Sequence, residues 1–166
     1  MKTQARAGFI YTLEWSRNGK IIDTEHVKNL LPIEGLNYLI AAGLTGGTTY
    51  GTWYMGLFRG SYMPVPGDTM SAFPAAATEM TDYALPTRPA ITFGAVANGA
   101  VDNQDARSEF AGTVNGRIVQ GGFIASAPAK GGTTGILISA VRFPSPKTLG
   151  VGDILRVTGG FSMISN

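Results

Sequence analysis

Residues 8–29 read GFIYTLEWSRNGKIIDTEHVKN, and this stretch decides the fold class. In its first half, large apolar side chains occupy every second position: Phe9, Tyr11, Leu13 and Trp15. Alternation with a period of two is typical of a half-buried strand. Asn18-Gly19 follows, and this dipeptide favours a two-residue hairpin turn because both central residues of that turn need a positive φ. The stretch therefore predicts a β-hairpin whose second strand covers 20–27.

Similar apolar runs, separated by glycine-rich or Asn-Gly turns, continue to the end of the chain. They cover residues 52–58, 89–97, 107–113, 117–126, 136–143 and 153–164. About eight short strands, spaced by roughly 8–12 residues, are typical of a sandwich or barrel. For 166 residues one domain is the default. We expect an all-β, single-domain antiparallel β-sandwich, jelly-roll-like, over residues 8–166, preceded by an N-terminal arm at 1–7.

Two segments depart from the strand pattern. Leu36, Leu39 and Ile40 are spaced as on one face of a helix, with Pro32 before them and Gly43 after them. This spacing predicts one short helix near 33–42. Residues 60–88 hold four prolines and no periodic pattern, which predicts a long loop. Loops of that length within a compact domain usually serve a function, and we expect this one to leave the sandwich and reach a partner.

The composition excludes several classes of protein. The net charge is +2 and the basic residues are scattered, so we expect no nucleic-acid partner. No apolar run approaches the length of a membrane span, and the N-terminus lacks the apolar core of a secretory signal. Charged residues make up only 14% of the chain, against about 25% in average proteins. Such a weakly charged surface suits a protein that packs against copies of itself or against another chain.

The sequence offers little to support catalysis. His26 is the single histidine, and the alternation of a strand places Asp23 and Glu25 on the opposite face from it. The segment AKGGTTG (129–135) lacks the spacing of a phosphate loop, and 102–109 lacks that of a calcium loop. With no cysteine, thiolate metal sites are excluded. We expect no enzyme activity, no cofactor and no metal.

The order of several sequence blocks resembles a known family of small proteins from tailed bacteriophages and prophages. The blocks are VKNLLPIEGLNYLI, GTWYMGLFRGSYMPVPGDT, TEMTDYALPTRPAITF, VDNQDARSEF, GGFIAS, GILISAVRF and LGVGDILRVTGGFSM. They cover nearly all of the chain from about residue 25 onward, and the chain looks like the capsid decoration, or cement, proteins of short-tailed phages. The resemblance implies a β-sandwich, often a jelly roll, on the exterior of the virion capsid, bridging neighbouring capsomers. The partners it implies are the major capsid protein and further copies of this chain, as a homodimer or homotrimer.

Six side chains on the N-terminal arm and on or beside the long loop are the expected contacts with such a partner. They are Arg6, Arg59, Tyr62, Met63, Phe73 and Arg88. An alternative stays open, in which the chain is a tail-fibre or receptor-binding component. In that case Trp53, Tyr54 or Tyr62 would contact host polysaccharide.

Overall fold

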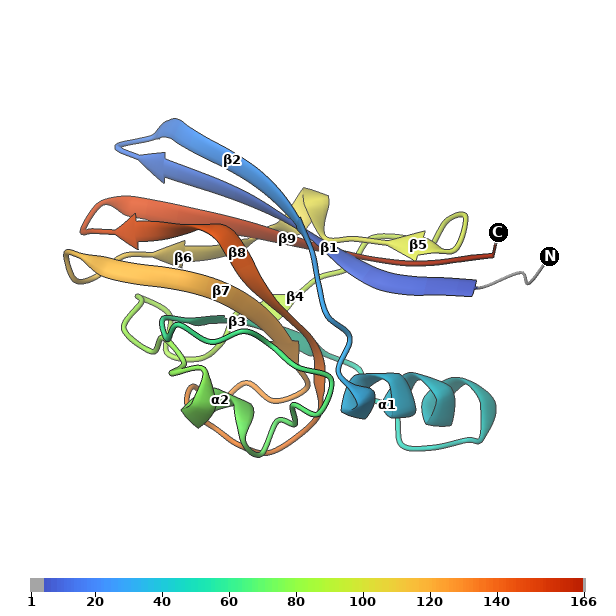
Figure 1. The fold of residues 1–166 in the computed structure, drawn as a ribbon. Helices are drawn as coiled ribbons and strands as arrows, with labels where there is room; N and C mark the ends of the chain where they lie inside the picture. Colours follow the sequence, from blue (N-terminus) through green and yellow to red (C-terminus); the bar gives the residue numbers. More distant parts are fainter. Residues whose placement is uncertain (1–4, 166) are drawn as a thin grey trace.

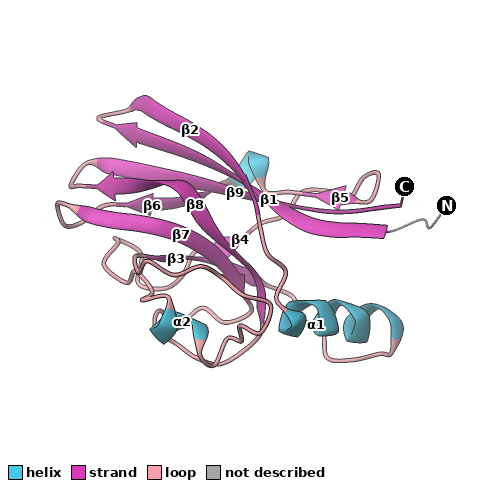
Figure 2. Ribbon diagram, viewed as in Figure 1, coloured by secondary structure: helices cyan, strands magenta, loops and turns pink. Residues whose placement is uncertain are grey.

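The computed structural model describes residues 5–165 as two antiparallel β-sheets packed face to face (Figure 1). The first sheet has the order β2-β1-β9-β5, with β6 also beside β9; the second has the order β4-β3-β7-β8. The strands are β1 (Ala5–Arg17), β2 (Lys20–Lys28), β3 (Trp53–Phe58), β4 (Ala90–Ile91), β5 (Ala100–Val101), β6 (Ser108–Ala111), β7 (Arg117–Ala125), β8 (Leu137–Leu149) and β9 (Asp153–Ser165). The helices lie around the outside of the sheets (Figure 2). The expected all-β antiparallel sandwich is confirmed.

The predicted N-terminal hairpin is confirmed in detail. Asn18 and Gly19 have φ values of 50° and 76°, as the turn requires. The alternating side chains of β1 point between the sheets, and Phe9, Tyr11 and Leu13 are buried. On its other edge β1 pairs with β9 over its whole length, from Ala5↔Ser165 to Arg17↔Asp153. The first and last strands of the chain therefore form the centre of the first sheet.

The expected arm over residues 1–7 is only partly described. Residues 1–4 lie outside the described residues, but Ala5, Arg6 and Ala7 belong to β1 and pair with the end of β9. These three residues are therefore strand rather than arm. Together the start of β1 and the end of β9 form a ribbon that extends past the body of the sandwich, with β5 paired to β9 on its other side (Figure 1).

Residues 60–88 are mostly loop, as predicted, but the expectation that this loop leaves the sandwich to reach a partner is wrong. It contains a short helix, α2 (Phe73–Ala76), and a second hydrophobic cluster. Phe73 is fully buried and packs edge-on against Phe58 and Phe123, with ring centroids 5.6 and 5.3 Å apart. Met70 and Met80 are also fully buried. The prolines break regular structure, but the apolar side chains between them cover the outer face of β3 and β7.

The predicted helix is present as α1 (Ile33–Leu44), two residues longer than expected. Its first turn approaches β8 through a small residue. Gly35 lies so close to β8 that a Cβ atom there would be 2.8 Å from the Cα atom of Ile138. Glu34 fixes the same turn, since its Oε2 atom accepts hydrogen bonds from the amides of Met70 (2.8 Å) and Leu137 (2.7 Å).

The predicted strand at 89–97 is mostly irregular, and only Ala90–Ile91 pairs with β3. The Asn98-Gly99 turn behind it is present, with φ values of 51° and 71°. It returns the chain to the first sheet through β5. A 3₁₀ turn, η1 (Gln104–Ala106), then leads to β6, within the polar run at 102–109.

Candidate interaction surface

The six expected contact residues differ in how far they are exposed. Arg6, Arg59 and Met63 are exposed, whereas Tyr62 is half-buried. Its hydroxyl donates a hydrogen bond to Asp68 (2.6 Å), which raises the pKa of Tyr62 above its ordinary value. Phe73 and Arg88 are fully buried in their own chain. The expectation that these two side chains contact a partner is wrong, because neither is exposed to solvent.

Arg88 is held by four hydrogen bonds inside the chain. Its guanidinium donates two hydrogen bonds to Glu79 (2.8 and 2.7 Å) and one each to the carbonyl oxygens of Ala127 (2.8 Å) and Gly132 (3.0 Å). It also lies 5.2 Å from the ring centroid of Phe123. Buried charges are usually paired in this way. Arg88 therefore joins the segment 60–88 to the loop between β7 and β8.

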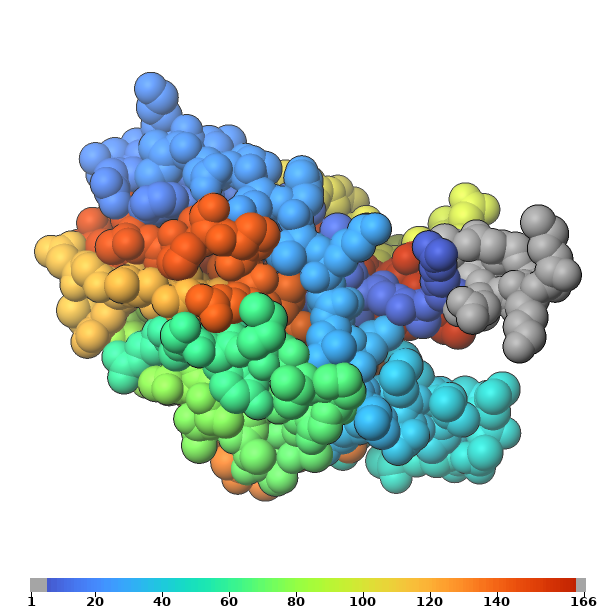
Figure 3. All heavy atoms as spheres, viewed as in Figure 1, coloured from blue at the N-terminus to red at the C-terminus, as the bar shows by residue number. Residues whose placement is uncertain are grey.

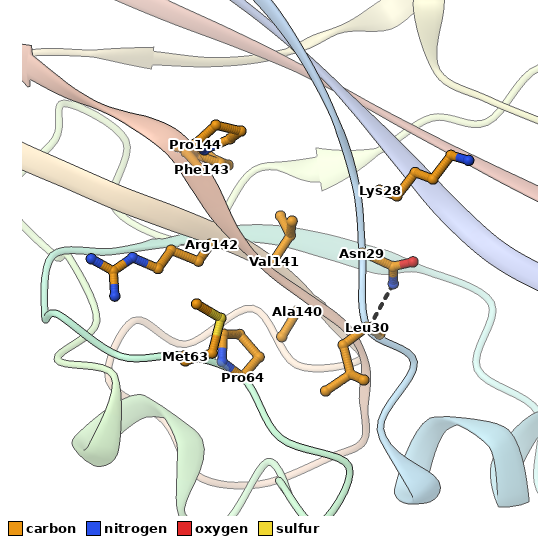
Figure 4. A pocket seen from close by; sticks show the side chains of 10 residues that line it. All are labelled: Lys28, Asn29, Leu30, Met63, Pro64, Ala140, Val141, Arg142, Phe143 and Pro144. Carbon is orange, nitrogen blue, oxygen red and sulfur yellow. Dashed lines mark hydrogen bonds between the residues drawn. The ribbon is translucent and has the colours of Figure 1, made fainter.

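Met63 lines a shallow groove of about 440 Å³ where the segment 63–64 runs alongside β8. Figure 4 shows Met63 and Pro64 beside Ala140, while Val141 and Lys28 point away from them. Met63 is 62% exposed. Among the residues expected to contact a partner, it is the apolar one that the structure leaves at the surface.

A more apolar cleft, of about 220 Å³, lies at the end of the sandwich beside α1. Every residue that lines it is apolar: Phe9, Leu39, Trp53, Phe93, Val101, Ile124, Ile138 and Phe161. Phe9 and Phe161 come from the first sheet, Trp53 and Ile138 from the second, and Leu39 from α1. The surface is hollowed between α1 and the β1–β9 ribbon (Figure 3). This cleft is the place where the core of the sandwich meets the surface.

The helix beside this cleft carries an exposed apolar stripe. The side chains recur at helical spacing, and their exposed fractions are high: Ile33 53%, Leu36 36%, Ile40 55% and Leu44 82%. Leu39 and Tyr38, on the other side of α1, are half-buried and pack against the core. We call Ile33, Leu36, Ile40 and Leu44 the α1 stripe. The spacing of Leu36 and Ile40 predicted the helix, but both lie on its solvent side.

The aromatic residues near the cleft pack on one another. Tyr38 lies edge-on to Trp53, with ring centroids 5.2 Å apart, and Tyr50 is 5.6 Å from Tyr38. The Tyr38 hydroxyl also accepts a hydrogen bond from the amide of Tyr50 (3.0 Å). Trp53 and Tyr54 are both half-buried. The sugar-binding role considered for Trp53 would have to use a ring that is already packed against Tyr38 and Tyr50.

The acidic residues beside His26 are separated from it, as the strand pattern predicted. Asp23 and Glu25 point to Lys147 of β8, with 3.1 Å between Lys147 Nζ and Glu25 Oε2. His26 is exposed on the other face, where its Nδ1 atom lies 2.9 Å from the Thr12 hydroxyl. Within residues 5–165 no group of three acidic or histidine side chains is placed to hold a metal ion. None of the helices described there is long and apolar enough to cross a membrane.

Comparisons with protein-family models, with curated proteins and with solved structures found no match to this chain. The candidate surface therefore rests on the geometry described above. It comprises the α1 stripe and the apolar cleft beside it. Sequence reasoning identified the helix but not its role, because periodicity alone does not tell which face of a helix packs on the core.

Proposed function

We propose that this chain is a structural virion protein that binds the outside of a tailed-phage capsid and bridges neighbouring capsomers. The observation that carries the proposal is the α1 stripe, four aliphatic side chains exposed in a row on one helix. Scattered single apolar residues are normal on a protein surface, but a contiguous patch marks an interaction site. The family resemblance supplies the identity of the partner, the major capsid protein.

The physical basis of binding is burial of the stripe and of the cleft. Moving one Leu or Ile side chain from water into an apolar contact contributes about 1.5–3 kcal/mol. The stripe contains four such residues, and the adjacent cleft has an apolar lining into which a partner side chain fits. A subunit that engages several capsomers at once binds more tightly, because the first contact raises the effective concentration for the second and later ones. Because the protein binds the assembled shell and not its dissociated subunits, binding stabilises the shell.

The location of the surface differs from the one that the sequence suggested. The loop 60–88 covers the second sheet of its own chain, so the proposal assigns shell contact to α1 rather than to Phe73 or Arg88. Met63 remains exposed, and the proposal assigns it a second contact with the shell. In the alternative of a receptor-binding component, Trp53 would stack on sugar rings. Its packing against Tyr38 and Tyr50 favours shell binding over that alternative.

Shell binding by variants of the α1 stripe tests the proposal. Ile40→Glu and Leu44→Glu each place a charge at an exposed position, so we expect the domain to fold normally. Val151→Glu is the matched control, since Val151 is 65% exposed in the turn before β9, at the far end of the sandwich from α1 (Figure 1). Shells lacking the protein are mixed with each purified variant and sedimented. Loss of binding in both α1 variants, with normal binding of the control, supports the proposal; equal binding by all three overturns it.

A further inference from the structure

The β1–β9 ribbon has one open strand edge. Residues 5–9 of β1 pair with β9 on one side. On the other side the ladder with β2 ends at the pair Ile10↔Lys28, after which the chain turns toward α1. Within the described residues, no strand pairs with residues 5–8 on that side. An unpaired edge of this kind is a template for an added strand.

Asn29 marks where the edge opens. Its amide donates a hydrogen bond to the Phe9 carbonyl oxygen (3.1 Å), and its side-chain oxygen accepts one from the Phe9 amide (2.7 Å). The amide and carbonyl of Phe9 thus both point away from β9. Alternate residues of an antiparallel strand share that direction, so the amide and carbonyl of Ala7 also point to the open side. Ala7 therefore presents one donor and one acceptor to an incoming strand.

The other edges of the sheets carry features that oppose strand addition. The outer strand β2 has charged residues along its length, and β8 carries Pro144 and Pro146. The remaining edge strands are short, since β4 and β5 have two residues each and β6 has four. Charges, prolines and short length are the common means by which natural edges avoid pairing. The open part of β1 reads Arg-Ala-Gly and has small side chains next to its free backbone groups.

The groove along this edge is positively charged. It has a volume of about 390 Å³, and its lining includes Arg6 and Lys28 but no carboxylate. The neighbouring groove shares Lys28 and adds Arg142, again without a carboxylate. Within residues 5–165 none of these three side chains forms an ion pair. The groove thus combines free main-chain groups with unpaired positive charge.

We propose that the open edge of β1 accepts an extended, acidic segment of a partner chain as an added strand. Main-chain hydrogen bonds to Ala7 would hold the segment, and Arg6 and Lys28 would select acidic side chains. A second copy of the same edge fits less well, because it would bring another Arg6 and Lys28 into the groove. The inference does not rest on the proposed function, since it uses a different surface from the α1 stripe.

Amide hydrogen exchange with a synthetic peptide tests this inference. The probe is acetyl-Thr-Glu-Val-Glu-Val-Glu-Thr-amide, and the matched control has Lys in place of each Glu. We expect the acidic peptide to slow exchange at Ala7 severalfold and the basic peptide to leave it unchanged. A version of the acidic peptide methylated at alternate backbone nitrogens should lose the effect. The amide of Met163, already bonded to the Gly99 carbonyl oxygen (2.8 Å), serves as an internal reference.

Charge reversal completes the experiment. In the double variant Arg6→Glu with Lys28→Glu, the basic peptide should protect Ala7 and the acidic one should not. Both side chains lie at the surface, so the fold should be retained. Failure of every peptide to protect Ala7, or equal protection by acidic and basic peptides, overturns the inference. Protection of Ala7 that rises with protein concentration in the absence of peptide also overturns it, because it shows pairing between two copies.

Discussion

The guanidinium of Arg88 and the carboxylate of Glu79 face each other in two parallel hydrogen bonds, and both side chains are buried within the chain. Glu79 also accepts a hydrogen bond from the amide of Gly131 (2.8 Å). The pair therefore links the segment 60–88 to the β7–β8 loop. It explains why a segment with four prolines is fixed to the sandwich instead of reaching outward.

Removing one member of this pair should be strongly destabilising. Arg88→Ala leaves the Glu79 carboxylate buried without its partner, and we expect a loss of about 3–5 kcal/mol in the free energy of unfolding. Replacing both residues, with Arg88→Met and Glu79→Leu, should restore much of that loss. Urea denaturation measures both, with Arg59→Ala as an exposed control expected within about 0.5 kcal/mol of the parent. A loss below about 1 kcal/mol for Arg88→Ala contradicts the structural role assigned to the pair.

Deleting residues 61–80 should unfold the domain. This segment supplies Met70, Phe73 and Met80, all fully buried, and large buried side chains each contribute several kcal/mol. Near-ultraviolet circular dichroism should lose its tertiary signal in the deletion. A deletion variant that keeps this signal and unfolds cooperatively would show that the segment is a dispensable arm, contrary to its packing.

The stability of the protein should depend on the ionisation of Asp153. Hydrogen bonds from Arg17 lower the pKa of this carboxyl below its ordinary value. When folding lowers the pKa of a carboxyl, the ionised carboxylate stabilises the folded protein. This contribution is fully present above the unfolded pKa, about 3.9 for Asp, and is lost as the pH falls through the folded pKa. Asp153→Asn should therefore reduce stability by roughly 1–3 kcal/mol near neutral pH, and the difference should shrink under acidic conditions. The exposed control Asp105→Asn should show no such trend, and a constant difference for Asp153→Asn at all pH values would refute the assignment.

Gly56 in β3 should not tolerate a side chain. A Cβ atom there would overlap the ring of Phe123 on the neighbouring strand β7. We expect Gly56→Ala to lower the free energy of unfolding by about 1–3 kcal/mol through overpacking. Phe123→Leu should relieve part of this, so the double variant should lose less than the sum of the two single losses. Thermal or urea denaturation measures these losses. If the loss in the double variant equals the sum of the two single losses, the two side chains do not contact each other.

The features that the sequence predicted are those specified locally. The hairpin over residues 8–27 follows from alternation and from Asn18-Gly19, which both act within a few residues. The helix follows from Leu36, Leu39 and Ile40 in the same way. The face of the helix that packs on the sandwich could not be predicted in this way. Gly35 makes the close contact with β8, and a glycine does not contribute to an apolar periodicity.

The features that the sequence did not predict depend on distant partners. Phe73 is buried because Phe58 and Phe123 form a surface for it, and these residues come from other parts of the chain. Arg88 looks like an ordinary surface arginine until Glu79 and the carbonyl oxygens of the β7–β8 loop are placed around it. The open edge of β1 likewise appears only when the end of the β2 ladder is known.

Electron microscopy of purified phage particles, at a resolution that shows strands, tests the central claim most directly. The account predicts hundreds of copies of this chain on the outer surface of the capsid, with α1 and the apolar cleft against the shell. A handful of copies confined to the tail, or copies on the shell whose α1 stripe faces solvent, would contradict it.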